Sequence, residues 1–429
     1  MTQMDELLLL VHRMPYPPNK GDKIRSYHLL RQLTQHYRVH LGTFIDDADD
    51  WRHVPQVRAL CASAYFLPLS PLRGRLRSLR ALLANRALSL DFYSDSRMRA
   101  WVAATMAERR IARVVVFSAA MAQYVPQGPG LRSVVDFCDV DSDKWRQYAE
   151  KKRWPASQLY RYEASRLLRY ERAVAARSDA ALFVSREEAA LFAQLAPESA
   201  GHIGHFNNGV DTVYFAPQLD SVNPYPPGQR AVVFTGAMDY WPNVDAVEWF
   251  AREILPLVRR EQPAVRFHIV GARPTPAVLA LARLDGVSVS GTVPDVRPYL
   301  QHAELAVAPL RVARGIQNKV LEAMAMARTV VVTPQALEGI AATPGSELLL
   351  ASDAAAFASA VCQALAHPQA GLGRAARARV EADYGWSAKL APLLALLAEA
   401  PAAPAAARDS PGAKAASPAT TFALSKEPR

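Results

Sequence analysis

Cysteine is scarce in this sequence of 429 residues, which has only three, far apart at Cys61, Cys138 and Cys362. An odd number at wide spacing indicates neither a disulfide framework nor a zinc site, so we expect a reducing, cytoplasmic environment. A long hydrophobic run is also missing, because no stretch reaches the roughly 18 apolar residues that a membrane-spanning helix needs. The first residues, MTQMDELLLLVHR, place two acids before a short apolar run. This pattern predicts a buried strand and does not fit a signal peptide.

The usual glycine-rich nucleotide signatures are missing as well. The loop after this first strand, MPYPPNKGDKIRSYHLL, has neither the G-x-x-x-x-G-K-[ST] nor the G-x-G-x-x-G spacing. The basic residues of the chain come without zinc-finger spacing, an RNA-binding aromatic run or a helix-turn-helix pattern. We therefore expect no nucleic-acid partner.

Positive charge is concentrated in one part of the chain. The formal net charge is +10, and the segment 73–113 holds ten arginines against three acids. Its first part, RGRLRSLRALLANR, interleaves arginine with leucine. Two interpretations remain open, a helix that lies on an anionic membrane surface and a solvated helix face.

Short apolar strands alternate with amphipathic helices, which is typical of a parallel sheet covered by helices. A Pro- and Asn-rich linker is predicted near residue 215. The strands predicted before it are LLLLVHR, RVHLGTF, AYFLPL, RVVVFS, SVVDFC and AALFVS. The strands predicted after the linker are AVVFTG, VRFHIVG, VSVSG, LAVAPL, TVVVT and ELLLA. We predict two doubly wound α/β domains, 1–215 and 216–385. A helix at 386–400 and a disordered Ala/Pro/Ser-rich tail at 401–429 complete the chain.

In such sheets ligands bind beyond the carboxyl ends of the strands, so the loops there are the candidates for a site. In the first domain, Gly21 permits close backbone approach at a helix start that attracts anions. CDVDSDKW places Asp139, Asp141 and Asp143 at alternate positions. Helix capping and a calcium loop are two interpretations of these carboxylates, although the later glycine of an EF-hand is missing. The third is a general base for an acceptor hydroxyl, with Asp139 or Asp141 as the candidate.

In the second domain, FTGAMDYWPN turns from strand to helix, with Gly236 open to a phosphate and Asn243 expected as the N-cap. RGIQNKVLEAMA begins another helix after a strand, so the amides from Gly315 onward point to the same edge. Lys319 can reach phosphate oxygens. Glu322 lies one helical turn after Asn318 and can accept hydrogen bonds from a sugar diol. A simple Lys319–Glu322 pair would contribute only a few tenths of a kcal/mol, which explains the arrangement poorly.

The chain resembles glycosyltransferase family 4 over residues 5–400. The resemblance is carried by three motifs that occur in the same order, NNGVD, GTVPDVRPYLQHAELAVAPL and NKVLEAMAMARTVVVT. MPYPPNKGDKIRSYHLL and ARGIQNKVLEAMAM are more narrowly similar to the sugar transferases of PEP-CTERM exopolysaccharide systems. The resemblance implies the GT-B fold, in which two Rossmann-like domains face a central cleft. It also implies transfer of a sugar from a nucleotide-diphosphate sugar to an acceptor hydroxyl, with retained configuration and with neither a metal nor a resident cofactor.

By the same resemblance, Glu322 binds the ribose, Lys319 and the neighbouring amides bind the phosphates, and Gly21 faces the donor. The partners implied are the nucleotide-sugar donor, a lipid-linked or glycan acceptor and the anionic inner-membrane surface. We accordingly expect a cytoplasmic protein that associates peripherally with that membrane.

The sequence departs from the family pattern at Arg314, where relatives carry the first glutamate of a Glu-x7-Glu motif. The loop after FTG also lacks the cation that usually meets the diphosphate. Our hypothesis is that Arg314 replaces that cation as a catalytic phosphate clamp, together with Lys319. Two further functions remain open, a nucleotide-sugar epimerase of the same fold and a weakly catalytic scaffold that binds partners.

Overall fold

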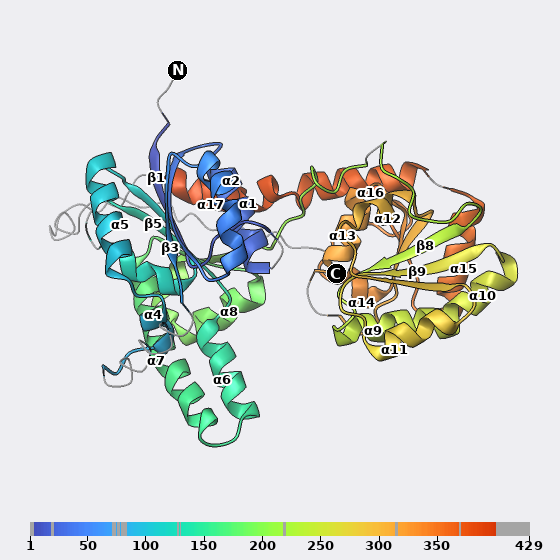
Figure 1. Cartoon of the computed structure of the whole chain (residues 1–429), viewed down its shortest axis with the longest axis horizontal. Helices are drawn as coiled ribbons and strands as arrows, with labels where there is room; N and C mark the ends of the chain where they lie inside the picture. The colour runs from blue at the N-terminus through green and yellow to red at the C-terminus, as the bar shows by residue number, and fades with distance from the viewer. Residues whose placement is uncertain are drawn as a thin grey trace, which may run out of the picture.

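The structure is a computed structural model that describes residues 4–18, 21–70, 74, 78, 84–126, 128, 130–217, 220–313, 316–368 and 370–399. Two domains lie side by side (Figure 1), and each contains one parallel sheet. The 73–86 segment RGRLRSLRALLANR falls largely outside the described residues, and so do Arg314, Gly315 and the 401–429 tail.

The first domain has a seven-stranded sheet in the order β3-β2-β1-β4-β5-β6-β7. Its strands are β1 Glu6–Val11, β2 Arg38–Ile45, β3 Ser63–Pro68, β4 Arg113–Phe117, β5 Arg132–Cys138, β6 Ala180–Phe183 and β7 Ile203–His205. The helices between them are α1 Gly21–Leu33, η1 Ala48–His53, α2 Val54–Leu60, α4 Leu88–Phe92, α5 Ser96–Arg109, η2 Ala119–Tyr124, α6 Asp141–Lys151, α7 Ala156–Arg177, α8 Arg186–Leu195 and η3 Pro197–His202. Every strand pair is parallel.

The second domain has a six-stranded sheet in the order β10-β9-β8-β11-β12-β13. Its strands are β8 Arg230–Thr235, β9 Val265–Val270, β10 Val287–Gly291, β11 Leu305–Ala308, β12 Val330–Val332 and β13 Leu349–Leu350. The helices are α9 Trp241–Trp249, η4 Phe250–Ile254, α10 Leu255–Glu261, α11 Pro276–Ala280, η5 Leu281–Arg283, α12 Arg297–His302, α13 Asn318–Ala325, α14 Pro334–Leu337, α15 Ala354–Ala366 and α16 Ala370–Asp383. In both sheets the first strand is central, and later strands are added first on one side of it and then on the other. This is the Rossmann-like, doubly wound order.

The apolar runs of the sequence become the centres of these sheets. Leu7–Val11 and Val330–Val332 are at most 1% exposed, because helices cover both faces of a parallel sheet. Every strand predicted from the sequence is present, and the predicted α/β class with two doubly wound domains is confirmed. The short edge strand β7 was not predicted. Its three residues carry too little apolar pattern to stand out.

The chain crosses between the domains at two places that touch each other. The amide of Val210 donates to the carbonyl of Tyr384 at 2.7 Å. A Cβ atom on Gly209 would come within 2.9 Å of the Trp386 backbone, so glycine is required for this approach. The last helix, α17 (Trp386–Ala398), then packs into the core of the first domain with its apolar face, made by Trp386, Leu390, Leu393 and Leu397 (Figure 1).

Candidate functional site

A cavity of about 530 Å³ opens at the carboxyl edge of the second sheet. It is built by the loops after β8, β9 and β10 and by the start of α13. The lining residues are Thr235, Gly236, Ala237, Tyr240, Asn243, Gly271, Ala272, Thr292, Val293, Val296, Ile316, Gln317, Asn318, Lys319 and Glu322. The lining combines polar side chains with the apolar Val293, Val296 and Ile316.

Four of the residues predicted from the sequence line this cavity, namely Gly236, Asn318, Lys319 and Glu322. They come from two loops more than 80 positions apart, which the order β8-β11-β12 brings to one edge. Sequence reasoning did not find Gly271, Ala272 or Thr292. Their loops carry no charge pattern, and only the sheet order places them here.

Two glycines form the floor of the cavity from backbone alone. A Cβ on Gly271, whose φ is +151°, would lie 1.8 Å from the carbonyl oxygen of Gly236. A Cβ on Gly236 would lie 2.8 Å from Nδ2 of Asn243. The Gly271 loop therefore packs directly on the Gly236 backbone, and the Gly236 loop packs on Asn243, so that neither position has room for a side chain.

Asn243 is not the N-cap that we expected. Helix α9 begins at Trp241, and Asn243 lies inside its first turn with 4% of its surface exposed. The side-chain Nδ2 donates to the carbonyl of Ala237 at 2.9 Å and so holds the loop that carries Gly236. Pro242 explains the shift, because proline is favoured in the first turn of a helix and moves its start upstream.

Helix α13 begins at the cavity with its first amides uncapped. Gln317 stands at the N-cap position and makes no side-chain hydrogen bond to the helix, so the first amides remain available to a ligand. Gln317 instead accepts a hydrogen bond from Nζ of Lys319 at 3.2 Å. Lys319 is the only cationic side chain among the described residues that line the cavity.

The pKa values of Lys319 and Glu322 are both shifted in the direction that favours the neutral side chain. Burial lowers the pKa of Lys319 to about 8, opposed by the nearby Glu322 carboxylate. Burial raises the pKa of Glu322 to about 7, opposed by Lys319. Each charge is poorly solvated without a ligand, so a phosphate at Lys319 and hydroxyl donors at Glu322 would both be favoured.

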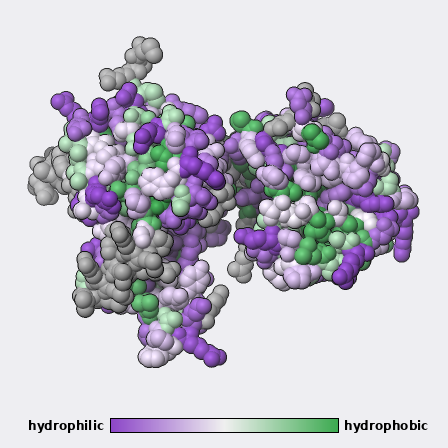
Figure 2. Space-filling model, viewed as in Figure 1, coloured by the Kyte–Doolittle hydropathy of each residue, from purple (hydrophilic) through white to green (hydrophobic). Residues whose placement is uncertain are grey.

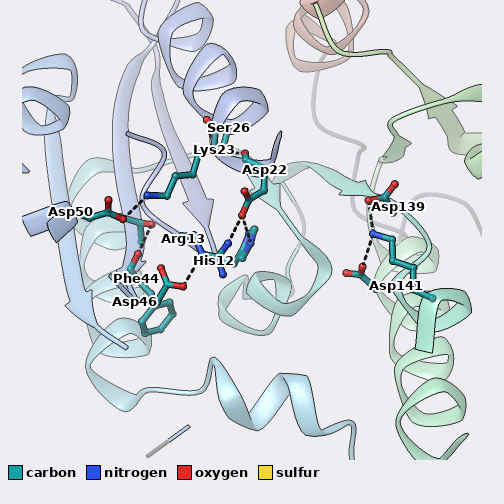
Figure 3. A network of polar contacts seen from close by, with 12 residues as sticks. His12, Arg13, Asp22, Lys23, Ser26, Phe44, Asp46, Asp50, Asp139 and Asp141 are labelled. Carbon is teal, nitrogen blue, oxygen red and sulfur yellow. Dashed lines mark hydrogen bonds and ion pairs between the residues drawn. The ribbon is translucent and has the colours of Figure 1, made fainter. Parts of the chain in front are cut away.

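The first domain carries a second polar cluster at the carboxyl ends of β1 and β2 (Figure 3). Arg13 donates to Asp22 at 2.7 Å and to Asp46 at 2.9 Å, while Nε2 of His12 lies 3.6 Å from Asp22. The hydrogen bond with His12, and next the charge of Arg13, hold the pKa of Asp22 well below its usual range. Gly21 begins α1 beside this cluster, with open space where a Cβ would stand.

Asp139, the predicted base, lies across from this cluster and is already engaged (Figure 3). Nζ of Lys144 lies 2.5 Å from Asp139 and 3.4 Å from Asp141. Burial raises the pKa of Asp141, opposed by Lys144. Asp143 turns away to Arg146. Among the described residues no group of three or more such side chains is placed to hold a metal ion, so the structure adds no support to the calcium interpretation.

Residues 229–367, the body of the second domain, match the family described as "Glycosyl transferases group 1". No curated protein matches the sequence. Across the described residues, no helix is both long and apolar enough to cross a membrane.

Solved structures share the fold of nearly the whole chain. A sucrose-phosphate synthase from Thermosynechococcus elongatus is 19% identical, with a TM-score of 0.57 over 91% of this chain and 98% of that one. Anabaena HepE in complex with UDP is 14% identical, with a TM-score of 0.54 over 92% and 99%. WaaG, a glycosyltransferase involved in lipopolysaccharide biosynthesis, is 14% identical, with a TM-score of 0.50 over 91% and 98%. The chain has the GT-B fold, and the family match supports a glycosyltransferase.

Proposed function

We propose that the protein transfers a sugar from a nucleoside-diphosphate sugar to an acceptor hydroxyl, in the synthesis of exopolysaccharide or another cell-surface glycan. The observation that carries the proposal is that Lys319 and Glu322 share one cavity with the glycine floor at Gly236. A cation, uncapped amides and a carboxylate within one helical turn fit a diphosphate and a ribose side by side.

The roles follow from the chemistry of the lining. Lys319 and the first amides of α13 would stabilise the charge that develops on the leaving diphosphate. Glu322 would accept hydrogen bonds from the ribose hydroxyls, and the wall at Val293 and Val296 would contact the base. HepE was solved with UDP and with UDP-glucose, so a uridine donor is the first to test.

The retaining, metal-independent mechanism and the role of Gly21 rest on the resemblance to glycosyltransferase family 4, whereas the roles of Asp139 and Arg314 are hypotheses from the residues of this sequence. We propose a retaining, metal-independent transfer in which Asp139, oriented by Lys144, accepts the proton of the acceptor hydroxyl. In this proposal Gly21 would face the donor from the first domain, and Arg314 and the amide of Gly315 would contribute to phosphate binding. The bond between the anomeric carbon and the diphosphate oxygen breaks, the nucleoside diphosphate leaves with that electron pair, and the new glycosidic bond forms at the acceptor oxygen.

Calorimetry with UDP, GDP and ADP tests the donor site directly. We expect one of the three to bind and Glu322→Gln to weaken it by about tenfold, because a carboxylate makes stronger hydrogen bonds than an amide. Glu261→Gln, at an exposed position of the same domain outside the cavity lining, is the matched control. No binding of any nucleotide by the wild-type protein would exclude the transferase and favour the scaffold.

Product analysis separates the two enzyme classes. With a radiolabelled sugar nucleotide, a transferase releases the nucleoside diphosphate and transfers or hydrolyses the sugar. An epimerase of this fold would instead change the configuration of the sugar.

Arg314→Glu should abolish tight donor binding if Arg314 is the phosphate clamp, and unchanged binding by calorimetry would contradict that role.

A further inference from the structure

Helices α6 and α7 form a hairpin that projects from the first domain, away from its sheet (Figure 1). The hairpin starts at Asp141, three residues after the carboxyl end of β5. Its two helices pack through Trp145, whose ring lies 5.2 Å from that of Tyr160. At its base, the buried Glu171 of α7 accepts hydrogen bonds from the amide and hydroxyl of Ser142. The hairpin is therefore braced along its length.

The far end of the hairpin exposes large apolar side chains. Trp154, in the turn, is 79% exposed and is the most exposed tryptophan among the described residues. Tyr148 and Leu159, one on each helix near the turn, are 51% and 42% exposed. A stable soluble protein gains nothing by ordering such side chains in water, so their gathering at a projecting end indicates a contact surface.

The charge around this end is positive. Residues 147–161, QYAEKKRWPASQLYR, hold four basic residues against one acid, Glu150. That acid is taken up by Arg146 at 2.7 Å. Lys152 and Arg153, directly before Trp154, are exposed and make none of the ion pairs found between described residues.

We propose that this hairpin tip, Tyr148 to Leu159, docks on an anionic lipid bilayer. Tryptophan and tyrosine prefer the level of the lipid headgroups, where the ring is in an apolar setting and its polar edge meets water. Lysine and arginine beside them are attracted to anionic headgroups, by about fivefold in affinity for each residue close to the surface. A nucleic acid would engage the same charges. It offers no apolar layer for Trp154 and Leu159 together, and so the bilayer fits better.

Helix α7 of the hairpin contacts the described end of the Arg-rich segment 73–86 and the residues that follow it. Arg166 of α7 donates to the side chain of Asn85, at the described end of the Arg-rich segment 73–86. Glu163 of α7 accepts from the amides of Leu88 and Ser89. The hairpin thus touches the described end of the segment for which membrane contact was one interpretation from sequence alone.

Docking at the tip would hold the carboxyl edge of the first sheet at a fixed height above the bilayer. The use of that height rests on the proposed function. Helix α6 has 11 residues, and at 1.5 Å per residue it places Asp139 about 16 Å above the tip. An acceptor glycan that stands on a lipid headgroup would reach that height. Its hydroxyl would then meet the carboxyl edge of the first sheet without leaving the membrane.

Vesicle flotation of the full chain tests the proposal. The wild-type protein should float with vesicles of phosphatidylglycerol and phosphatidylethanolamine, and much less with phosphatidylcholine alone. Trp154→Ser/Leu159→Ser and Lys152→Glu/Arg153→Glu should each lower the partition coefficient about tenfold or more. Neither pair supports the packing between α6 and α7, and circular dichroism should show unchanged folding.

Matched controls remove the same residue types elsewhere. Trp51→Ser, at a half-exposed tryptophan of η1, and Arg260→Glu/Arg283→Glu, on the surface of the second domain, should float like the wild type. The proposal is overturned by a wild-type protein that stays unbound, or by tip variants that float as well as the controls. It is also overturned if the tip variants lose oligonucleotide binding while keeping vesicle binding. UDP calorimetry on the same variants reports the proposed function separately, since the tip lies outside the donor cavity.

Discussion

The guanidinium of Arg25 in α1 and the carboxylate of Asp136 in β5 form a buried, two-point ion pair. Nε lies 2.8 Å from Oδ2 and Nη2 lies 3.1 Å from Oδ1, and neither residue is more than 1% exposed. Nη1 of Arg25 also donates to the carbonyl of Phe206 and to Oδ1 of Asn208, each at 3.0 Å. One side chain thus joins the helix after the Gly21 loop, the central sheet and the segment that leaves the first domain.

Asp136→Asn should destabilise the first domain strongly, because it leaves the Arg25 charge buried without a counter-ion. Breaking a buried pair in this way costs about 3–5 kcal/mol. Urea unfolding followed by circular dichroism measures the loss. Glu198→Gln, which breaks the exposed pair between Arg172 and Glu198, is the control and should change the midpoint little. A change equally small in Asp136→Asn would contradict the role of this pair.

Donor affinity should depend on pH with a maximum between about pH 7 and 8. Below pH 7 Glu322 takes up a proton and stops accepting two hydroxyls, and above pH 8 Lys319 loses the charge that meets the phosphate. Calorimetry with UDP from about pH 5.5 to about pH 9.5 measures both sides of this profile. Glu322→Gln should remove the acid side alone. A flat profile in the wild-type protein would contradict the assignment of both groups.

The glycine floor predicts a loss of binding without a loss of fold. Gly236→Ala adds a Cβ that meets the Asn243 side chain at 2.8 Å, so either this loop or Asn243, both of which line the cavity, must shift. We expect UDP affinity to fall about tenfold or more while the melting temperature drops by only a few degrees. Gly371→Ala, on the exposed start of α16 with no atom within 4 Å, is the control and should keep full affinity. Equal affinity in both variants would exclude close backbone approach by the ligand.

Gly21→Ala tests the contribution of the first domain. The added Cβ meets no atom within 4 Å and φ there is not left-handed, so the fold should be unaffected. If Gly21 faces the donor, the rate of sugar transfer should fall in this variant. The affinity for UDP should change less, because UDP is expected to bind in the cavity of the second domain. Comparing the turnover rate with the calorimetric affinity separates the two effects. An unchanged rate would mean that the donor does not touch Gly21.

Glu171 predicts a pH-dependent stability of the hairpin base. Burial raises its pKa to about 8, opposed by the hydrogen bonds from Ser142. Because the folded pKa is raised, the protonated carboxyl stabilises the protein below the unfolded pKa near 4.5, and this contribution is lost as the pH rises through about 8. Glu171→Gln should be more stable than the wild type at pH 9, on the order of a few kcal/mol. Urea midpoints at pH 5 and pH 9 check the prediction, and a gap that does not change with pH would contradict it.

The strands and the two-domain order were predictable from the sequence, because apolar runs of five or six residues between helices have one stable solution, a parallel sheet buried on both faces. Lys319 and Glu322 were recognisable for a local reason. Charges at the start of a helix with an apolar face are unusual, and their spacing within one turn is visible in the letters. Arg314 stood out in the same way, as a departure from a family pattern.

The tertiary structure alone decided what no local pattern carries. Gly271 reaches the cavity only because β9 lies beside β8, and Arg25 meets Asp136 across 111 positions of the chain. Trp154 is an ordinary aromatic residue in the sequence, and its meaning lies in the hairpin that holds it away from the domain. Local order follows from the spacing of neighbouring side chains, whereas closeness between distant loops follows from strand order, which the spacing of residues along the chain does not encode.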